Sequence, residues 1–318
     1  MGPASGLPCC FICSVNTTAP ENMATCGNPC PEARARLGGV DHNALDVESR
    51  ALFDRVAARL PATGRLGVAY SGGVDSATLL AVAVSALSRD RVVALLGVSP
   101  SLAASERELA HSVAADIGAE LVEIKTHEGE RAGYVANGPD RCFHCRDELF
   151  SVISDVVVAQ LGLAAVAYGE NADDTRRLDR PGARAAGEHG VLRPLVGLSK
   201  QEVRQLARAF GLAVADKPAA PCLASRIPHH TPVTEAKLRQ VEQAEAAIRA
   251  AGLSDCRVRH HGEVARIEVP VQELGVVVER REDVLRGVRA AGFRFVALDL
   301  AGIQSGAFTL PLLSPRHE

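Results

Sequence analysis

The sequence predicts an α/β protein: a doubly wound, mostly parallel sheet followed by a smaller α+β domain. Two observations favour this fold. Short apolar runs alternate with amphipathic helical segments as far as residue 228, and the order of elements changes beyond it. The chain has 318 residues, enough for two domains that each bury a core. We expect a disordered Cys-rich extension over residues 1–43, the first domain over 44–228, the second over 229–310 and a tail over 311–318.

Strands and helices alternate through the first predicted domain. Apolar residues recur at helical spacing over 52–60, and Pro61 and Gly64 then end that helix. Ser199 and Glu202 form a capping box that opens a later helix, which Gly211 ends. Between these helices we expect strands at 66–70, 92–98, 121–124 and 164–168, with helices at 77–87, through 109–117 and after Cys145.

The second predicted domain opens with an amphipathic helix that carries Leu238, Val241 and Ile248. Strands and helices no longer alternate regularly after it, which predicts a small α+β domain for substrate binding or oligomerisation. The further elements expected are strands at 257–260, 265–269 and 293–298 and a helix near Val284.

Charge and composition exclude several classes of function. Lys and Arg number 35 and Asp and Glu 38, so no basic excess favours a nucleic-acid partner. No apolar run is long enough for a membrane span, and the first residues lack the basic-then-apolar order of a signal peptide. We therefore expect a cytoplasmic protein with a small-molecule partner and neither a nucleic acid nor a membrane.

Nine cysteines are many for a cytoplasmic chain, where disulfides do not persist, so metal or sulfur chemistry is the favoured explanation. Five of them lie in the first thirty residues, among Pro, Gly, Thr and Asn and without periodic pattern. This composition predicts disorder, or a true start at Met23; a zinc knuckle is the alternative interpretation. The five are Cys9, Cys10, Cys13, Cys26 and Cys30.

The segment from Ser71 to Ser76, SGGVDS, lies between a predicted strand and a predicted helix. Gly72 and Gly73 let backbone N–H groups turn inward, and the following helix adds its positive N-terminal end, so the segment suits an anion. The Ser71 and Ser76 hydroxyls can donate to phosphate oxygens, whereas Asp75 suits Mg²⁺. The spacing matches neither a Walker loop nor GxGxxG. We predict an ATP-binding phosphate loop; an ordinary glycine turn is the alternative.

Two adjacent carboxylates follow the predicted strand at 164–168. Asp173 and Asp174 fall at a predicted helix start, at the end of the strand that faces the ligand crevice of an open parallel sheet. They are candidates for contacts to a metal ion or a ribose. The alternative is that they cap the helix, which Asp favours.

Three cysteines of the first predicted domain form a candidate metal site. Cys142 and Cys145 make a C-x-x-C, and Cys222 lies eighty residues downstream. Three thiolates on a [4Fe-4S] cluster would leave one iron open. A zinc site needs a fourth ligand, and a C-x-x-C redox pair is a further alternative. Candidates for the fourth zinc ligand are His144, His229, His230 and Cys256.

Several segments together resemble one family. SGGVDSATLLAVA, RCFHC, KPAAPCLASRIP, VRHHGEVARIEV and GFRFVALDLAGIQSG occur in that order. The glycine loop is similar to the PP-loop of the ATP pyrophosphatases, which have the adenine nucleotide alpha hydrolase-like fold. From about residue 45 to 306, the set resembles the LarE family, the ATP-dependent sacrificial sulfur transferases of nickel-pincer nucleotide cofactor synthesis.

The resemblance implies a reaction. Ser71, Gly72, Gly73, Asp75 and Ser76 would bind ATP with Mg²⁺, and a carboxylate of pyridinium-3,5-biscarboxylic acid mononucleotide would be adenylylated. A sulfur nucleophile would then displace AMP to give a thiocarboxylate. In some family members, the cysteine that matches Cys222 gives up its sulfur and becomes dehydroalanine. Others hold a [4Fe-4S] cluster on three cysteines, and the presence of Cys142, Cys145 and Cys222 favours that version.

The resemblance also implies substrate contacts in the second predicted domain. Arg257 and Arg259 alternate along a strand and so project to one face, where they would clamp a phosphate or carboxylate; a solvated strand face is the alternative. Glu245 lies near a functional glutamate of the family. Arg226, close to Cys222, would lower the pKa of a thiol or simply be a surface charge.

The chain departs from the family pattern at several positions. Arg146 stands where many members have Lys, and Gln304, Ala307 and Phe308 replace residues that are commonly Arg, Ser and Met. These differences concern the C-terminal substrate contacts and the identity of the acceptor. The partners that the resemblance implies are the other enzymes of nickel-pincer cofactor synthesis and further copies of the chain in a homo-oligomer.

Three other functions are compatible with a phosphate loop and cysteines. A PP-loop tRNA thiolation enzyme would bind tRNA with a steep salt dependence, which the charge balance disfavours. An amide-forming synthetase would need an ammonia source, and the chain has no room for a glutaminase domain. A zinc-stabilised nucleotide-binding protein would never cleave ATP to AMP and pyrophosphate.

Overall fold

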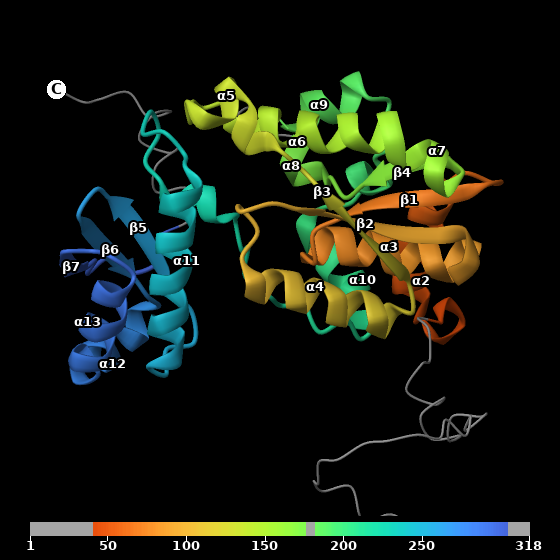
Figure 1. Cartoon of the computed structure of the whole chain (residues 1–318). Coiled ribbons are helices and arrows are strands. Elements are labelled where there is room, and N and C mark those ends of the chain that lie inside the picture. The colour runs from red at the N-terminus through yellow and green to blue at the C-terminus, as the bar shows by residue number, and fades with distance from the viewer. Residues whose placement is uncertain (1–40, 176–181, 305–318) are drawn as a thin grey trace, which may run out of the picture. The chain divides into compact units, whose positions relative to one another are not determined.

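The computed structural model describes residues 41–175 and 182–304 (Figure 1). The predictions for the five N-terminal cysteines, for Ala307 and Phe308, and for the tail over 311–318 lie outside these ranges. None of the helices within them is long and apolar enough to cross a membrane.

The larger sheet has four strands, all parallel, in the order β3-β2-β1-β4. Every one of its strands is close to a predicted strand, and the prediction of a parallel α/β sheet is confirmed. Parallel strands need a crossover between them, which explains the helical segments of the sequence. The strands are β1 (Arg65–Tyr70), β2 (Val92–Val98), β3 (Glu120–Lys125) and β4 (Leu163–Tyr168).

Helices cover both faces of this sheet, because successive strand residues point to opposite sides. Val68 of β1 packs into one hydrophobic core, whereas Ala69 belongs to another. The first core is closed by α2 (Val47–Ala57), α3 (Val74–Leu87), α4 (Ala104–Ile117) and α10 (Lys200–Ala209). The second is closed by α6 (Arg141–Val152), the π-helical turn η4 (Ile153–Val157) and α9 (Gly182–Glu188) (Figure 1).

The start of α10 agrees with the prediction from the sequence, whereas the start of α6 differs from it. Ser199 and Glu202 form the predicted capping box of α10. The helix expected after Cys145 instead begins at Arg141, so both cysteines of the C-x-x-C lie on its first turns. The reason is tertiary, since the Arg141 side chain is buried against a distant segment.

Short elements complete this part of the chain. They are η1 (His42–Ala44), η2 (Arg89–Arg91), η3 (Glu128–Glu130), α5 (Ala132–Val135), α7 (Val158–Leu161), α8 (Ala172–Thr175), η5 (Pro194–Gly197) and η6 (Leu223–Arg226).

The smaller sheet is mixed, in the order β5-β6-β7, with the first pair antiparallel and the second parallel. Its core also includes Tyr134 and Leu223, which precede the predicted domain boundary at 228. The boundary stays a prediction. The elements are α11 (Glu235–Ala250), β5 (Arg257–His261), β6 (Val264–Glu268), η7 (Val271–Glu273), α12 (Leu274–Glu279), α13 (Arg281–Ala290) and β7 (Phe295–Leu298).

Candidate functional site

The strand order of the larger sheet creates a point at which the direction of winding reverses, between β1 and β4. Open α/β sheets bind ligands outside the carboxyl ends of their strands at such a point. The predicted phosphate loop (residues 71–76) follows β1 directly, and Gly169 follows β4. Both predicted nucleotide-binding segments therefore meet at this reversal point.

The phosphate loop has the backbone that an anion-binding loop requires. Gly72 has φ +72°, a conformation that side chains disfavour, and a Cβ on it would lie 2.9 Å from the Ala110 Cβ. The Ser71 N–H donates to the Ser76 Oγ at 3.2 Å, and that hydroxyl donates to the Gly73 carbonyl at 3.1 Å. The loop closes over the start of α3, whose N-terminal end attracts negative charge.

Gly169 packs against the phosphate loop from the β4 side. A Cβ at this position would lie 3.0 Å from the Asp75 carbonyl carbon and 3.0 Å from the Ser76 nitrogen. Glycine therefore suits this position, because a Cβ would require the loop backbone to shift by a few tenths of an ångström. The contact fixes the segment after β4 beside the loop after β1.

Asp75 is at the centre of a polar network that sequence analysis did not predict. The Lys200 Nζ donates to its Oδ2 at 2.5 Å, and the Asn171 Nδ2 donates to its Oδ1 at 3.1 Å. Lys200 is the first residue of α10, directly after the predicted cap Ser199, and no local signal marks it as a site residue. Its side chain is 37% exposed, so it remains accessible to a bound anion.

Asp173 and Asp174 belong to the same network. The Asn171 Oδ1 accepts hydrogen bonds from the backbone N–H groups of both, so Asn171 caps α8 and the interpretation of the aspartates as caps is wrong. The Asp174 Oδ2 accepts from the Asn171 Nδ2 at 2.9 Å, and the Asp173 Oδ2 accepts from the Lys200 N–H at 2.7 Å. Their use in binding a metal or ribose stays a prediction.

Cys222 lies just before η6 and is exposed. The next residue, Leu223, donates its N–H to the Ser101 carbonyl at 3.0 Å. Ser101 follows β2, the neighbour of β1 in the sheet. This bond connects the Cys222 segment to the carboxyl-end loops of the sheet, where the phosphate loop also lies.

The three candidate cysteines affect one another electrostatically. Burial raises the pKa of the Cys145 thiol well above its ordinary value, and negative charge on Glu128, Cys222 and Cys142 raises that pKa further. Cys142 and Cys222 are exposed. Among residues 41–175 and 182–304, however, no group of three or more His, Cys, Asp or Glu side chains is arranged to hold a metal ion. Metal binding by the three thiols stays a prediction.

Two of the proposed fourth ligands are engaged elsewhere. Cys256 lies in the core of the smaller sheet and donates to the Glu245 carbonyl at 3.4 Å. Burial, with a smaller contribution from Glu245, raises its pKa to about 12. The His229 Nδ1 lies 3.2 Å from the Asn137 carbonyl oxygen, and burial lowers the pKa of His229.

Three predicted residues, Arg226, Glu245 and Arg259, lie in two buried ion pairs. Arg226 contacts both oxygens of Glu245, at 2.8 and 3.3 Å, and Arg259 contacts Glu268 at 2.7 Å. Because Arg226 is buried, its interpretation as a surface charge is wrong. Glu245 also accepts from the Val258 N–H at 3.0 Å, so it supports the β5 strand as well as Arg226.

Arg257 differs from its neighbours because no carboxylate of the described ranges pairs with it. It is 6% exposed, and its guanidinium donates to the carbonyls of Gln304 at 3.3 Å and Ala219 at 3.1 Å. Burial lowers its pKa, as do the positive charges of Arg226 and Arg259. Arg257 and Arg259 both donate to the Gln304 carbonyl, so the prediction that they share one side of β5 is confirmed. The interpretation as a solvated strand face is wrong, because both are buried.

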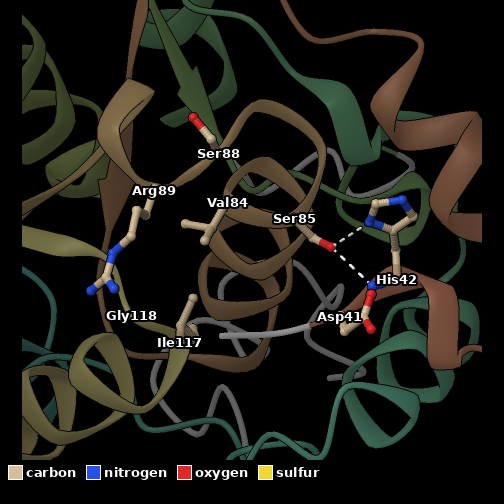
Figure 2. Close-up of a pocket in the computed structure, with 8 residues that line it drawn as sticks. All are labelled: Asp41, His42, Val84, Ser85, Ser88, Arg89, Ile117 and Gly118. Atoms are coloured by element: carbon tan, nitrogen blue, oxygen red, sulfur yellow. Dashed lines mark hydrogen bonds between the residues drawn. The ribbon is translucent and has the colours of Figure 1, made fainter. Parts of the chain in front are cut away.

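One cavity of the described residues lies away from this site. A cavity of about 370 Å³ lies at the carboxyl end of α3, whereas the phosphate loop lies at its amino end. Figure 2 shows His42 and Ser85 in its wall, joined by a bond of 2.8 Å from the His42 Nδ1 to the Ser85 Oγ. Its other lining residues are Asp41, Val84, Ser88, Arg89, Ile117 and Gly118, and none is a predicted site residue.

Comparison with known proteins agrees with this arrangement. The family model of asparagine synthase matches residues 49–166, which include the phosphate loop. Pyridinium-3,5-bisthiocarboxylic acid mononucleotide synthase of Lactiplantibacillus plantarum is 34% identical over 250 residues, covering 76% of this chain and 88% of that protein. The chain belongs to the LarE family. The resemblance found in the sequence motifs is therefore confirmed.

Two further relatives are similar to this chain over about three quarters of its length. An uncharacterized protein of Synechocystis sp. is 40% identical over 243 residues, covering 75% of this chain and 90% of that protein. An uncharacterized protein of Methanocaldococcus jannaschii is 24% identical over 235 residues, or 73% and 88% of the two chains. Family membership and the phosphate loop together indicate that this LarE-family chain is an ATP-utilising enzyme.

Proposed function

We propose that the protein is an ATP-dependent sulfur transferase. It adenylylates a carboxylate of pyridinium-3,5-biscarboxylic acid mononucleotide and converts it to a thiocarboxylate, in nickel-pincer nucleotide cofactor synthesis. The observation that carries the proposal is the position of Cys222. The Cys222 thiol is exposed, and the next residue, Leu223, donates to Ser101 in a carboxyl-end loop of the larger sheet. The residues before Cys222 accept from buried arginines: Pro221 from Arg226 and Ala219 from Arg257.

The phosphate loop supports the first step. The loop N–H groups and hydroxyls would hold the ATP phosphates, and Asp75 would bind Mg²⁺ once Lys200 turns toward the phosphates. A substrate carboxylate oxygen attacks the α-phosphorus, and pyrophosphate leaves. The product is an acyl adenylate, whose AMP is a good leaving group.

Cys222 supports the second step. Its thiolate attacks the acyl carbon, the bond to AMP breaks, and a thioester to Sγ forms. Loss of the Cys222 Cα proton and cleavage of its Cβ–Sγ bond then release the thiocarboxylate and leave dehydroalanine. Each chain would supply one sulfur by this route.

The substrate nucleotide needs an anion-binding group near the thiol. Arg257 suits this role because it is a buried cation that donates to backbone carbonyls rather than to a carboxylate. Its partner Ala219 lies three residues before Cys222. Arg259 and Glu245 are committed to ion pairs, so we expect them to orient Arg257 and the Cys222 segment.

The cluster version is a further part of the proposal. Cys142, Cys145 and Cys222 would hold a [4Fe-4S] cluster, which would carry a sulfide for transfer and allow repeated turnover. Three thiols are suitable ligands for such a cluster, and negative charge on Cys142 or Cys222 raises the pKa of the Cys145 thiol, as expected of neighbouring groups. Their arrangement among the described residues is not that of a closed metal site.

One experiment tests the sulfur transfer. The protein is incubated with MgATP and the biscarboxylate nucleotide, and AMP, thiocarboxylate and protein mass are measured. We expect AMP and thiocarboxylate from the wild type, and AMP without thiocarboxylate from Cys222→Ala. An intact Cys222 after AMP release, with no thiocarboxylate, would contradict the proposal and favour amide formation or another acceptor.

A second measurement distinguishes the sulfur sources. Iron and acid-labile sulfide are determined after anaerobic reconstitution of the wild type and Cys222→Ala. Four irons in the wild type and fewer in the variant would support the cluster. Zinc, or no metal together with loss of H₂S from Cys222, would leave the sacrificial route.

A further inference from the structure

Arg141 is a buried cation immediately before the first cysteine of the C-x-x-C. It is 8% exposed. Its Nη1 donates to the Asn137 Oδ1 at 2.6 Å and to the Ala224 carbonyl at 2.9 Å. The second contact spans 83 residues of sequence and ends two residues after Cys222. Arg141 thus connects the start of α6 directly to the Cys222 segment.

No carboxylate of the described ranges pairs with Arg141. Two other buried arginines, Arg226 and Arg259, each have the carboxylate of a buried glutamate within 3 Å. A buried charge is costly unless an opposite charge balances it. The groups bonded to Arg141 are the neutral oxygens of Asn137 and Ala224.

Both segments that Arg141 joins carry a candidate cysteine: Cys142 is the next residue along the chain, and Cys222 lies two residues before Ala224. Burial disfavours the charged form of Arg141, yet its pKa is raised overall, and the groups that raise it most are Cys222 and Cys142. A side-chain hydrogen bond to Cys142 contributes as well. Negative charge on either sulfur would therefore stabilise the Arg141 guanidinium.

Asn137 makes this connection rigid. It is fully buried with φ +57°, and its Nδ2 donates to the carbonyls of Ile227 at 3.3 Å, Pro228 at 2.8 Å and Thr231 at 2.9 Å. Its Oδ1 orients Arg141. One side chain thus satisfies three carbonyls of the stretch that follows Cys222, which a loop without this residue would leave unpaired.

We propose that Arg141 is a positioning residue for sulfur transfer. Held by Asn137, it keeps the Cys222 segment in register with Cys142 and balances the negative charge on the transferring sulfur. The inference rests on the proposed function, because it assigns Arg141 to the second step alone. Formation of the acyl adenylate at the phosphate loop does not need the contacts of Arg141 to Asn137 and Ala224.

The test compares Arg141→Gln, which removes the charge, with Arg141→Lys, which keeps it. Arg204→Gln is the matched control, because Arg204 also donates to two backbone carbonyls before Cys222, those of Ala215 at 2.7 Å and Lys217 at 2.9 Å. AMP formation and single-turnover thiocarboxylate formation are measured separately, after thermal melts have shown that each variant is folded.

For Arg141→Gln we expect AMP formation within about twofold of the wild type and thiocarboxylate formation about 100-fold slower, the usual effect of losing a donor to developing charge. Arg141→Lys should recover about tenfold of that loss. Arg204→Gln should change neither rate by more than about twofold.

Two results would overturn the inference: equal loss of both steps in Arg141→Gln, or equal effects of the Arg141 and Arg204 changes. If Arg141→Gln does not fold, Arg141→Lys decides, and a wild-type rate of sulfur transfer in it would also refute the assignment. A wild type that forms AMP but no thiocarboxylate would instead refute the proposed function.

Discussion

Lys200 and Asp75 are 125 residues apart in sequence, yet the Lys200 Nζ lies 2.5 Å from the Asp75 Oδ2. The pair joins the first turn of α3, which follows the phosphate loop, to the first residue of α10. A carboxylate bound to an ammonium group is a weaker ligand for Mg²⁺ than a free one. If Asp75 holds Mg²⁺ as we propose, binding of MgATP would separate this pair, and the γ- and β-phosphates would give Lys200 a replacement partner.

Lys200→Gln tests this exchange. We expect the KM for MgATP in AMP formation to rise about tenfold, because one charge-assisted contact to phosphate is lost. Asp75→Asn should instead lower the rate at saturating ATP by about 100-fold, because the metal loses its carboxylate. An unchanged KM in Lys200→Gln, in steady-state kinetics at several Mg²⁺ concentrations, would refute the exchange.

Gly169→Ala probes the approach of the β4 segment to the phosphate loop. The new Cβ would lie 3.0 Å from the backbone of Asp75 and Ser76, so the loop must shift. We expect the affinity for ATP to fall at least about tenfold, since misplacement of under 1 Å disturbs catalytic geometry strongly. Isothermal titration with a non-hydrolysable ATP analogue gives the affinity.

Gly187→Ala is the matched control for that change. Gly187 is an exposed residue of α9 with no atom within 4 Å of an added Cβ. Alanine there should leave ATP affinity unchanged and stabilise the protein by up to about 1 kcal/mol. Equal loss of affinity in both variants would show that Gly169 has no special role.

Glu245→Gln separates a structural role from a substrate contact. The change leaves Arg226 buried without its counter-charge, which costs about 3–5 kcal/mol and lowers Tm by at least about 6 °C. Glu235→Gln on the same helix should shift Tm by no more than about 2 °C, because its pair with Arg239 is exposed. An unchanged Tm with a raised KM for the nucleotide would make Glu245 a substrate residue instead.

The buried Cys256 thiol should make the free energy of unfolding depend on pH in the alkaline range. Burial raises its folded-state pKa to about 12, whereas an unfolded cysteine has a pKa of about 8.5. The neutral thiol is favoured in the fold, so this contribution is fully present below about pH 8.5 and is lost as the pH rises toward 12. At pH 10 the loss is about 2 kcal/mol.

Denaturant titrations of the wild type and Cys256→Ala at pH 7 and pH 10 measure this component. All other titrating groups are common to both proteins, so the difference between them should shrink by about 2 kcal/mol at pH 10. A difference independent of pH would mean that Cys256 ionises equally in both states.

The sequence predicted most of the architecture because its signals are local. Apolar runs at 66–70 and 92–98 and the capping box at Ser199 each depend on residues a few positions apart. The SGGVDS loop was found for the same reason. The start of α6 was placed too late, because the burial of Arg141 by Ala224 involves residues 83 positions apart.

The candidate site was predicted less completely. Asp75 was recognised from its motif, but Lys200 and Asn171 were not, since their contacts to Asp75 arise only when α10 and β4 reach the reversal point. Arg257 and Arg259 were expected to share one side of β5, and they do. Their burial was not evident, because the carbonyls and carboxylates around them come from distant segments.

The pairing of β1 with β4 has a consequence for biosynthesis. Ala69 pairs with Tyr168, so almost a hundred residues must leave the ribosome after the phosphate loop before the strand that completes its site can dock. Contacts of this sequence separation form slowly. A nascent chain ending before β4 would have the complete SGGVDS sequence but lack the Gly169 and Asn171 contacts to it. We therefore expect ATP binding to be acquired during synthesis only when the central sheet closes.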